Sequence, residues 1–266
     1  MSEGPGPVGL DVLVGPGAPG RLTSDDVDGL LAHYTAGVPH ARASRWVRAN
    51  MVSTVDGAAT GPDGRSGSVS SDVDKAVFGL LRGLADAVLV GAGTARSEGY
   101  GPAGRHRVLA ARREAAGRRA TAVVVQVTRS GRVETGRGMF EVPEAGLVVM
   151  PAGDAEALAR AREAAGEDGV VLAGHVDDGG PDLARALDAL AERGLRHVLC
   201  EGGPGLLADV AAADVLDELC LTTSPLLVAS DAPRVTAGAA VGPHGLELAG
   251  LLHARSTLLA RWLRRR

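Results

Sequence analysis

Residues 196–207, Arg-His-Val-Leu-Cys-Glu-Gly-Gly-Pro-Gly-Leu-Leu, are the stretch from which the fold can be predicted. The first five have the apolar pattern of a buried strand, whereas Leu206 and Val210 recur at helical spacing. The glycines between them, with Pro204 suited to a first helical turn, predict a tight turn from strand to helix. Backbone N–H groups and the positive end of a helix dipole favour a phosphate at such a turn. The sequence therefore predicts an anion site there, with Glu201 at its mouth.

Strand and helix patterns alternate along most of the chain. Strands are expected at residues 46–53, 87–90, 121–127, 146–150, 170–172 and 217–223. Helices are expected at residues 24–36, with Ser24 as the cap, from Ser70 or Ser71 to 84, and at 155–164 and 182–193. This alternation predicts an α/β fold, a mainly parallel sheet flanked by helices. Two further strand patterns within residues 246–262, with no helix between them, predict a C-terminal antiparallel edge.

Composition indicates a globular protein with no general affinity for nucleic acid. The chain has 266 residues, 45% of them hydrophobic, and a formal net charge of −4. No apolar run approaches ~18 residues, and no basic start precedes an apolar stretch, so neither a membrane span nor a signal peptide is expected. Cys200 and Cys220 lie in apolar segments, which favours reduced thiols in a cytoplasmic protein. No metal site is expected, because C-x-x-C and H-E-x-x-H spacings do not occur.

Polar residues gather after three of the expected strands, at residues 53–56, 91–98 and 201–205. The carboxyl ends of parallel strands meet at one edge of a sheet, where ligands bind in a crevice. Asp56 is a turn residue by its Asp-Gly sequence and a functional candidate by its place at a strand end. Taken alone, Arg82 would be interpreted as a charged residue on a solvated helix face, and Thr94 as the cap of the helical turn that follows it. The three sites together predict a ligand crevice.

Four motifs, taken in order, make the chain similar to a known family. They are S-T-V-D-G at Ser53–Gly57, L-L-R-G-L-A-D-A-V-L-V-G-A-G-T at Leu80–Thr94, E-G-G-P-x-L at Glu201–Leu206 and V-L-D-E-L-x-L-T-x-x-P at Val215–Pro225. Over about residues 45–265 they resemble the pyrimidine reductase domain of the riboflavin-biosynthesis deaminase/reductase. The resemblance implies a dihydrofolate-reductase-like fold and NADPH-dependent reduction of a ribosylaminopyrimidine phosphate. Hydride would reach ribose C1′ and give the ribitylamino product.

The resemblance also implies roles for individual residues. Those implied to bind the cofactor are Ser53, Ser70, Thr94, Glu98, Thr128, Arg129, Gly202, Gly203, Pro204, Gly205, Leu206 and Leu207. Those implied to bind the substrate are Arg82, Pro102, Arg105 and Glu201. Within these sets, Thr128 and Arg129 are expected at the NADPH 2′-phosphate and Arg105 at the substrate phosphate. Asp56 and Glu201 are the candidate catalytic acids, and the sequence does not choose between them.

Organisation is expected to follow the family. Residues 1–40, rich in Gly and Pro, are expected to form an N-terminal extension, and residues 41–266 the reductase domain. The family reductases pair through the sheet edge, which implies a homodimer with an apolar surface from Leu219, Leu221, Leu226 and Leu227. No H-x-E with a following P-C-x-x-C occurs, so deamination is expected of another protein.

Two departures and two alternatives accompany this resemblance. Ser68 stands where the family usually has Trp, and Gly99-Tyr100-Gly101 replaces a more usual acidic-proline stretch. One alternative is a dihydrofolate or dihydropterin reductase, an enzyme that holds the pterin with a buried acid on the helix facing the pocket. The first helix of this chain is instead expected to offer Arg82 and apolar residues there. The other alternative is a non-catalytic nucleotide-binding regulatory module.

Overall fold

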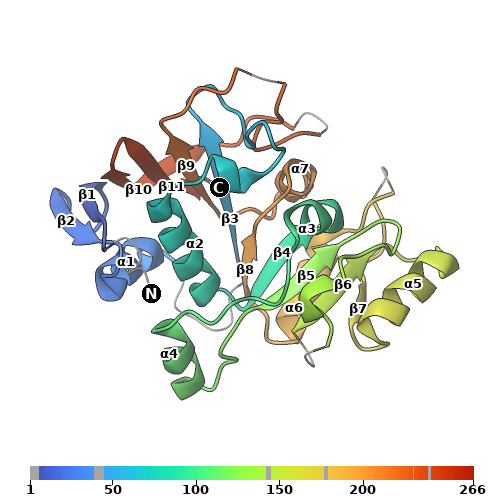
Figure 1. Ribbon diagram of the computed structural model, residues 1–266. Coiled ribbons are helices and arrows are strands. Elements are labelled where there is room, and N and C mark those ends of the chain that lie inside the picture. The colour runs from blue at the N-terminus through green and yellow to red at the C-terminus, as the bar shows by residue number, and fades with distance from the viewer. Residues whose placement is uncertain (1–5, 39–44, 142–144, 177–178, 230, 239–240) are drawn as a thin grey trace.

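The computed structural model describes residues 6–38, 45–141, 145–176, 179–229, 231–238 and 241–266. Figure 1 shows an extended sheet with helices packed against it. The strands are β1 Gly9–Val14, β2 Gly20–Thr23, β3 Trp46–Thr54, β4 Ala87–Gly91, β5 Val123–Val127, β6 Gly146–Met150, β7 Val170–Leu172, β8 His197–Cys200, β9 Glu218–Ser224, β10 Leu246–Ala254 and β11 Thr257–Arg264. The α-helices are α1 Val27–Thr35, α2 Asp72–Leu84, α3 Ala92–Glu98, α4 Leu109–Ala115, α5 Ala155–Ala165, α6 Leu183–Glu192 and α7 Pro204–Ala212.

The sheet has a parallel part and an antiparallel part. Its strand order is β2-β1-β10-β11-β9-β3-β8-β4-β5-β6-β7. From β9 to β7 all neighbouring strands run parallel, and from β2 to β9 all run antiparallel. The expected α/β architecture with a C-terminal antiparallel edge is confirmed, because β10 and β11 pair with β9 in this way.

Helices cover both faces of the parallel strands, which explains their continuous apolar sequences. In β4, Val88 and Val90 belong to the core that contains α2 residues, whereas Ala87 and Leu89 belong to the core that contains α6 and α7 residues. Helix α2 begins at its cap Ser71, whose side chain accepts a hydrogen bond from the Asp74 N–H at 3.3 Å. Only two residues separate the end of α2 at Leu84 from the start of β4 at Ala87. This short connection holds the helix against the middle of the sheet (Figure 1).

The segment before residue 39 contributes two strands and a helix to the same sheet and core. β1 pairs with β10, and β2 pairs with β1. Helix α1 is capped by Asp26 rather than by the expected Ser24, because the Ser24 hydroxyl accepts a hydrogen bond from the Val8 N–H instead. Leu10 and Leu30 of this segment pack into the core that also contains α2.

A buried ion cluster fastens α1 to the sheet. Glu218 of β9 forms ion pairs with Arg48 of β3 at 2.8 Å and with Arg261 of β11 at 2.7 Å. The two arginines also donate to backbone carbonyls at the end of α1, Arg48 to Tyr34 at 2.6 Å and Arg261 to His33 at 3.2 Å. Cations at the carboxyl end of a helix favour its dipole, so the cluster joins three strands and one helix.

Candidate active site

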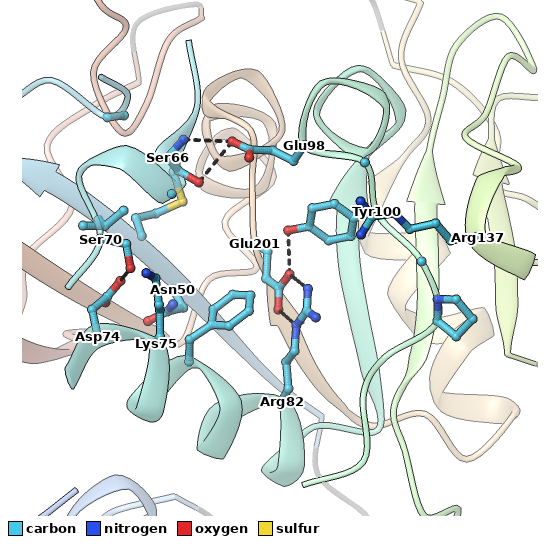
Figure 2. A pocket seen from close by; sticks show the side chains of 18 residues that line it. Asn50, Ser66, Ser70, Asp74, Lys75, Arg82, Glu98, Tyr100, Arg137 and Glu201 are labelled. Atoms are coloured by element: carbon cyan, nitrogen blue, oxygen red, sulfur yellow. Dashed lines mark hydrogen bonds and ion pairs between the residues drawn. The ribbon is translucent and has the colours of Figure 1, made fainter. Parts of the chain in front are cut away.

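The candidate active site lies beside α2, where β3, β8 and β4 end. A cavity of about 510 Å³ is present there. Figure 2 shows its polar lining residues, Asn50, Ser66, Ser70, Asp74, Lys75, Arg82, Glu98, Tyr100, Arg137 and Glu201. Met51, Phe78 and Pro102 add apolar surface. The carboxyl ends of parallel strands are where this topology is expected to hold a ligand.

Glu201 is the first residue after β8 and forms one wall of the cavity. Its backbone N–H donates to the Leu89 carbonyl of β4 at 2.9 Å. Arg82 reaches it from α2 through two bonds of 2.7 Å, from Nε to Oε1 and from Nη2 to Oε2. The Tyr100 hydroxyl donates to Oε2, also at 2.7 Å (Figure 2). Three hydrogen bonds therefore anchor a carboxylate whose side chain is only 2% exposed.

Arg82 and Tyr100 are held in defined protonation states by this arrangement. The Arg82 guanidinium lies over the Phe78 ring at 4.3 Å and the Tyr100 ring at 5.3 Å. Burial disfavours its charge, but the hydrogen bonds and charge of Glu201 outweigh that effect and raise the pKa of Arg82. Burial, helped by the Glu201 charge, raises the pKa of Tyr100 well above its usual value. Tyr100 thus keeps its proton and remains a donor at neutral pH.

One face of α2 is turned toward the cavity. Asp74, Phe78 and Arg82 are four residues apart and all line it, as helical spacing requires. The Ser70 hydroxyl donates to Asp74 Oδ2 at 2.5 Å. Burial raises the pKa of Asp74, and the hydroxyls of Ser70 and Thr222 partly oppose that rise. The buried apolar stripe of α2 lies on other positions, Val73, Val77, Leu80 and Leu81.

Three further charged groups line the cavity, Lys75 of α2, Glu98 of α3 and Arg137 from the segment after β5. Glu98, the last residue of α3, accepts hydrogen bonds from the Ser66 N–H at 2.9 Å and the Ser66 hydroxyl at 3.0 Å. This contact joins the loop before α2 to the end of α3. Lys75 and Arg137 line the cavity, and neither forms an ion pair with another residue in the described part of the chain. Two cations are thus available to an anionic ligand.

The expected strand–turn–helix at residues 196–207 is confirmed, with Gly203 as the N-cap of α7 and Pro204 in its first turn. No side chain caps this helix. The Gly203 N–H donates to Thr94 Oγ1 at 2.9 Å, and a Cβ at Gly203 would lie only 2.3 Å from that oxygen. Only glycine permits this approach. The bare helix N-terminus fits the diphosphate of a dinucleotide.

Several residues implied by the resemblance lie outside the cavity lining. Asp56 is exposed and accepts hydrogen bonds from the Thr54 hydroxyl and from the Val228 and Ala229 N–H groups, the last at 2.8 Å. The Thr54 hydroxyl and these backbone groups lower the pKa of Asp56. Asp56 therefore organises the loop at residues 228–229. Arg105 forms an exposed ion pair with Glu114 at 3.2 Å.

The other implied cofactor residues are spread around the glycine turn. Ser53 is buried within β3. Thr128 and Arg129 follow β5, and the Arg129 guanidinium lies 3.8 Å from Asp209 of α7. The structure thus brings Ser70, Arg82, Glu98, Pro102 and Glu201 to one cavity. In the described residues, no group of three His, Cys, Asp or Glu side chains is arranged to hold a metal ion. None of the described helices has the length and apolar character needed to cross a membrane.

Part of the site is not predictable from local sequence. The expectation that the first helix offers Arg82 and apolar residues in place of a buried acid is wrong, because Asp74 of this helix is buried at the cavity. In the sequence, Asp74 lies four residues before Phe78 and eight before Arg82, a spacing that predicts one shared helix face. Tyr100 stands out in the sequence only as a departure from the family, and Asn50 and Arg137 belong to none of the four motifs. Nothing in their local sequence marks those two, since chain folding alone brings them to the cavity.

Comparison with known proteins gives the family. Residues 45–256 match the RibD C-terminal domain. The chain belongs to this family. Its membership confirms the resemblance to the pyrimidine reductases and, with the observed sheet, the dihydrofolate-reductase-like fold. The RibD C-terminal family supports an oxidoreductase, specifically a pyrimidine reductase of the riboflavin pathway.

Solved structures of similar proteins have the same fold. A pyrimidine reductase-like protein from Corynebacterium diphtheriae is 25% identical with a TM-score of 0.75, over 86% of this chain and 96% of that one. The riboflavin biosynthesis reductase Rib7 from Saccharomyces cerevisiae is 15% identical with a TM-score of 0.63, over 91% of this chain and 100% of that one.

A bifunctional enzyme shares the same fold. The diaminohydroxyphosphoribosylaminopyrimidine deaminase/5-amino-6-(5-phosphoribosylamino)uracil reductase from Thermotoga maritima is 20% identical with a TM-score of 0.61. The match covers 84% of this RibD family chain but only 57% of the Thermotoga protein. A sequence comparison with curated proteins gives no match.

Proposed function

We propose that this member of the RibD C-terminal family is an NADPH-dependent reductase of a ribosylaminopyrimidine phosphate. The observation that carries the proposal is the Arg82–Glu201–Tyr100 cluster, which lies on the cavity wall directly before the glycine turn. Glu201 lines the ligand cavity and directly precedes the glycine turn at the start of α7, which would hold a diphosphate. Rib7 and the Thermotoga protein, whose names describe reductases, have the same fold.

The residues around the turn fit NADPH. The backbone N–H groups between Gly203 and Leu207 would hold its diphosphate, with Thr94 keeping the turn in place. Thr128 and Arg129 would hold the 2′-phosphate, and Ser53, Ser70 and Glu98 remain proposed contacts. When bound, NADPH supplies the hydride that reduces ribose C1′.

The cavity residues would bind and polarise the substrate. Arg82 uses Nε and Nη2 for Glu201, which leaves Nη1 for a ligand. Arg137 offers positive charge to the substrate phosphate, in addition to the implied Arg105. Of the two candidate acids we favour Glu201, since it lines the cavity and Asp56 does not. Its carboxylate would stabilise the positive charge that develops at C1′ as the ribose ring opens.

The proposal is tested by replacing Glu201 with Gln, which keeps the shape and removes the charge. The Kd for NADPH should stay within about twofold, because backbone groups hold the diphosphate. The kcat/KM with the ribosylaminopyrimidine phosphate should fall by about 10²–10³-fold. Glu192→Gln, at an exposed position on α6, is the matched control and should keep the parent rate. An unimpaired Glu201→Gln enzyme would make Glu201 structural and Asp56 the leading acid.

We also propose a homodimer, an N-terminal extension of residues 1–40 packed onto a reductase domain of residues 41–266, and a cytoplasmic location. Leu226 and Leu227 are 43% and 78% exposed, which supports an apolar contact surface. Leu219 and Leu221 are half-buried against the core and contribute less to this exposed apolar surface. Light scattering at micromolar concentration should return twice the chain mass. A monomer mass would refute the dimer.

A dihydropterin reductase is a second candidate, favoured by one observation, the buried Asp74 on α2. A buried carboxylate can hold the amino-substituted ring of a pterin through paired hydrogen bonds. NADPH oxidation with dihydrofolate, measured beside the ribosylaminopyrimidine phosphate, decides between the two substrates.

A further inference from the structure

The proposed mechanism leaves the Asp74 carboxylate without a role. Asp74 is 6% exposed and lines the cavity. Figure 2 shows it at one end of the cavity with Ser70 and Lys75, while Arg137 lies at the other end and the Arg82–Glu201 pair between them. A substrate that spans the cavity would therefore meet Asp74 with the part farthest from Arg137.

The protein provides Asp74 with hydroxyl partners but no direct cation. The groups around it are the hydroxyls of Ser70 and Thr222, the charge of Lys75 and, from α1, the buried Tyr34. Within the described residues, Asp74 forms no ion pair. Two hydroxyls use about two of the roughly four lone-pair sites of a carboxylate. Acceptor capacity thus remains, and a buried carboxylate is costly unless donors satisfy it.

Phe78 determines what kind of donor can reach this carboxylate. It lies one helical turn after Asp74 on the same face of α2, and both line the cavity. A flat heterocycle that packs against Phe78 beside the Arg82 guanidinium can present its edge to Asp74. Two parallel N–H groups on that edge match the two oxygens of one carboxylate.

We propose that Asp74 binds the 2-amino-4-oxo edge of the substrate ring, accepting hydrogen bonds from the ring N3–H and the adjacent 2-amino group. This inference rests on the proposed reductase function and names its substrate class, a ribosylaminopyrimidine phosphate that still carries the 2-amino group. In the corresponding uracil, a carbonyl oxygen replaces that amino group. One hydrogen bond is then lost, and the carbonyl oxygen faces the carboxylate, so the uracil is rejected.

The test uses two ring probes that differ only at C2, 2,5,6-triaminopyrimidin-4-one and 5,6-diaminouracil. Calorimetric titration of the full chain should give at least about tenfold tighter binding of the triamino probe. Asp74→Asn offers one acceptor and one donor, which complements the uracil edge instead. The variant should abolish or reverse the preference.

Asp72→Asn provides the matched control. It removes the same charge from the same helical turn at an exposed position outside the cavity lining, and should keep the parent preference. The Kd for NADPH, measured on each variant, confirms that Asp74→Asn is folded. Equal weakening of both probes in Asp74→Asn, with the ratio unchanged, would overturn the inference and make Asp74 structural.

Turnover separates this inference from the proposed function. If the 2-amino riboside phosphate is reduced faster than the uracil one, and Asp74→Asn narrows the ratio, both stand. If the parent protein prefers the uracil riboside phosphate, the role of Asp74 is refuted while the reductase stands. If neither is reduced but dihydrofolate is, and Asp74→Asn loses that activity, the proposed function fails. The edge recognition then survives, because pterins carry the same 2-amino-4-oxo edge.

Discussion

At the residue scale, Glu201 organises the candidate active site. Its buried carboxylate holds Arg82 through two bonds and Tyr100 through one, so three side chains from separate segments share one geometry. Arg82 cannot turn away without breaking a bidentate ion pair and leaving a buried charge. Substrate contacts proposed for Arg82 thus depend on Glu201, although the carboxylate itself is almost fully covered.

Cofactor choice is also a residue-scale property, and it leads to a prediction for Arg129. A charge-assisted contact with the 2′-phosphate contributes ~1.5–3 kcal/mol, so Arg129→Ala should narrow the NADPH/NADH affinity ratio by roughly ten- to a hundredfold. Fluorescence titration with both nucleotides measures the ratio. An unchanged ratio would place the 2′-phosphate elsewhere, with Arg96 of α3 as the next residue to replace.

The residues of the site that belong to recognisable motifs are predictable from the sequence. Glu201 and Arg82 were expected at one crevice because each follows or precedes a strand in a family-like order. Asp74 is buried at the cavity and meets the Thr222 hydroxyl of β9, a contact that no local pattern reveals. Tyr100 reaches Glu201 across 101 residues of sequence, a contact that only the folded chain creates.

At the element scale, the turn between β8 and α7 has no room for a side chain. A Cβ at Gly203 would lie 2.3 Å from Thr94 Oγ1, so Gly203→Ala must displace either Thr94 or the turn itself. The Kd for NADPH should rise by about tenfold or more. In the control Gly79→Ala, the new Cβ on α2 meets nothing within 4 Å and binding should be unchanged. Parent-like affinity of Gly203→Ala would show that the turn is not the cofactor cradle.

Helix α1 gives a second element-scale prediction, through its buried His33. Burial, with the nearby Arg261 charge, lowers the pKa of His33 to about 4 from 6.5. Between these two values the unfolded chain binds a proton that the folded chain does not. The free energy of unfolding should therefore fall by about 1.4 kcal/mol per pH unit as the pH drops from 6.5 toward 4.

Urea unfolding of the parent and of His33→Phe across pH 4.5–7.5 measures this contribution as a difference in slope, with the pH range set by the ordinary and lowered pKa values. The His33→Phe variant should have the shallower dependence. His175→Gln, at an exposed position, should match the parent protein. Identical slopes for His33→Phe and the parent would contradict the lowered pKa of His33.

At the scale of the whole molecule, the parallel part of the sheet was predictable and its outermost antiparallel strands were not. Long apolar strands between amphipathic helices identified β3 to β9. β1 and β2 lie in a Gly- and Pro-rich segment, and their pairing with β10 is a contact between the two ends of the chain. The pairing of β1 with β10 thus depends on long-range packing and not on the local hydrophobic pattern of either strand.

Labelled hydride transfer is the decisive measurement for the proposed reaction. NADPH carrying deuterium at the transferable position of the nicotinamide is incubated with the protein and the ribosylaminopyrimidine phosphate, and the product is examined by NMR and mass spectrometry. The account predicts a ribitylamino product with a single deuterium at C1′. A protein that binds NADPH but leaves this substrate unreduced, or a product without deuterium at C1′, would contradict it.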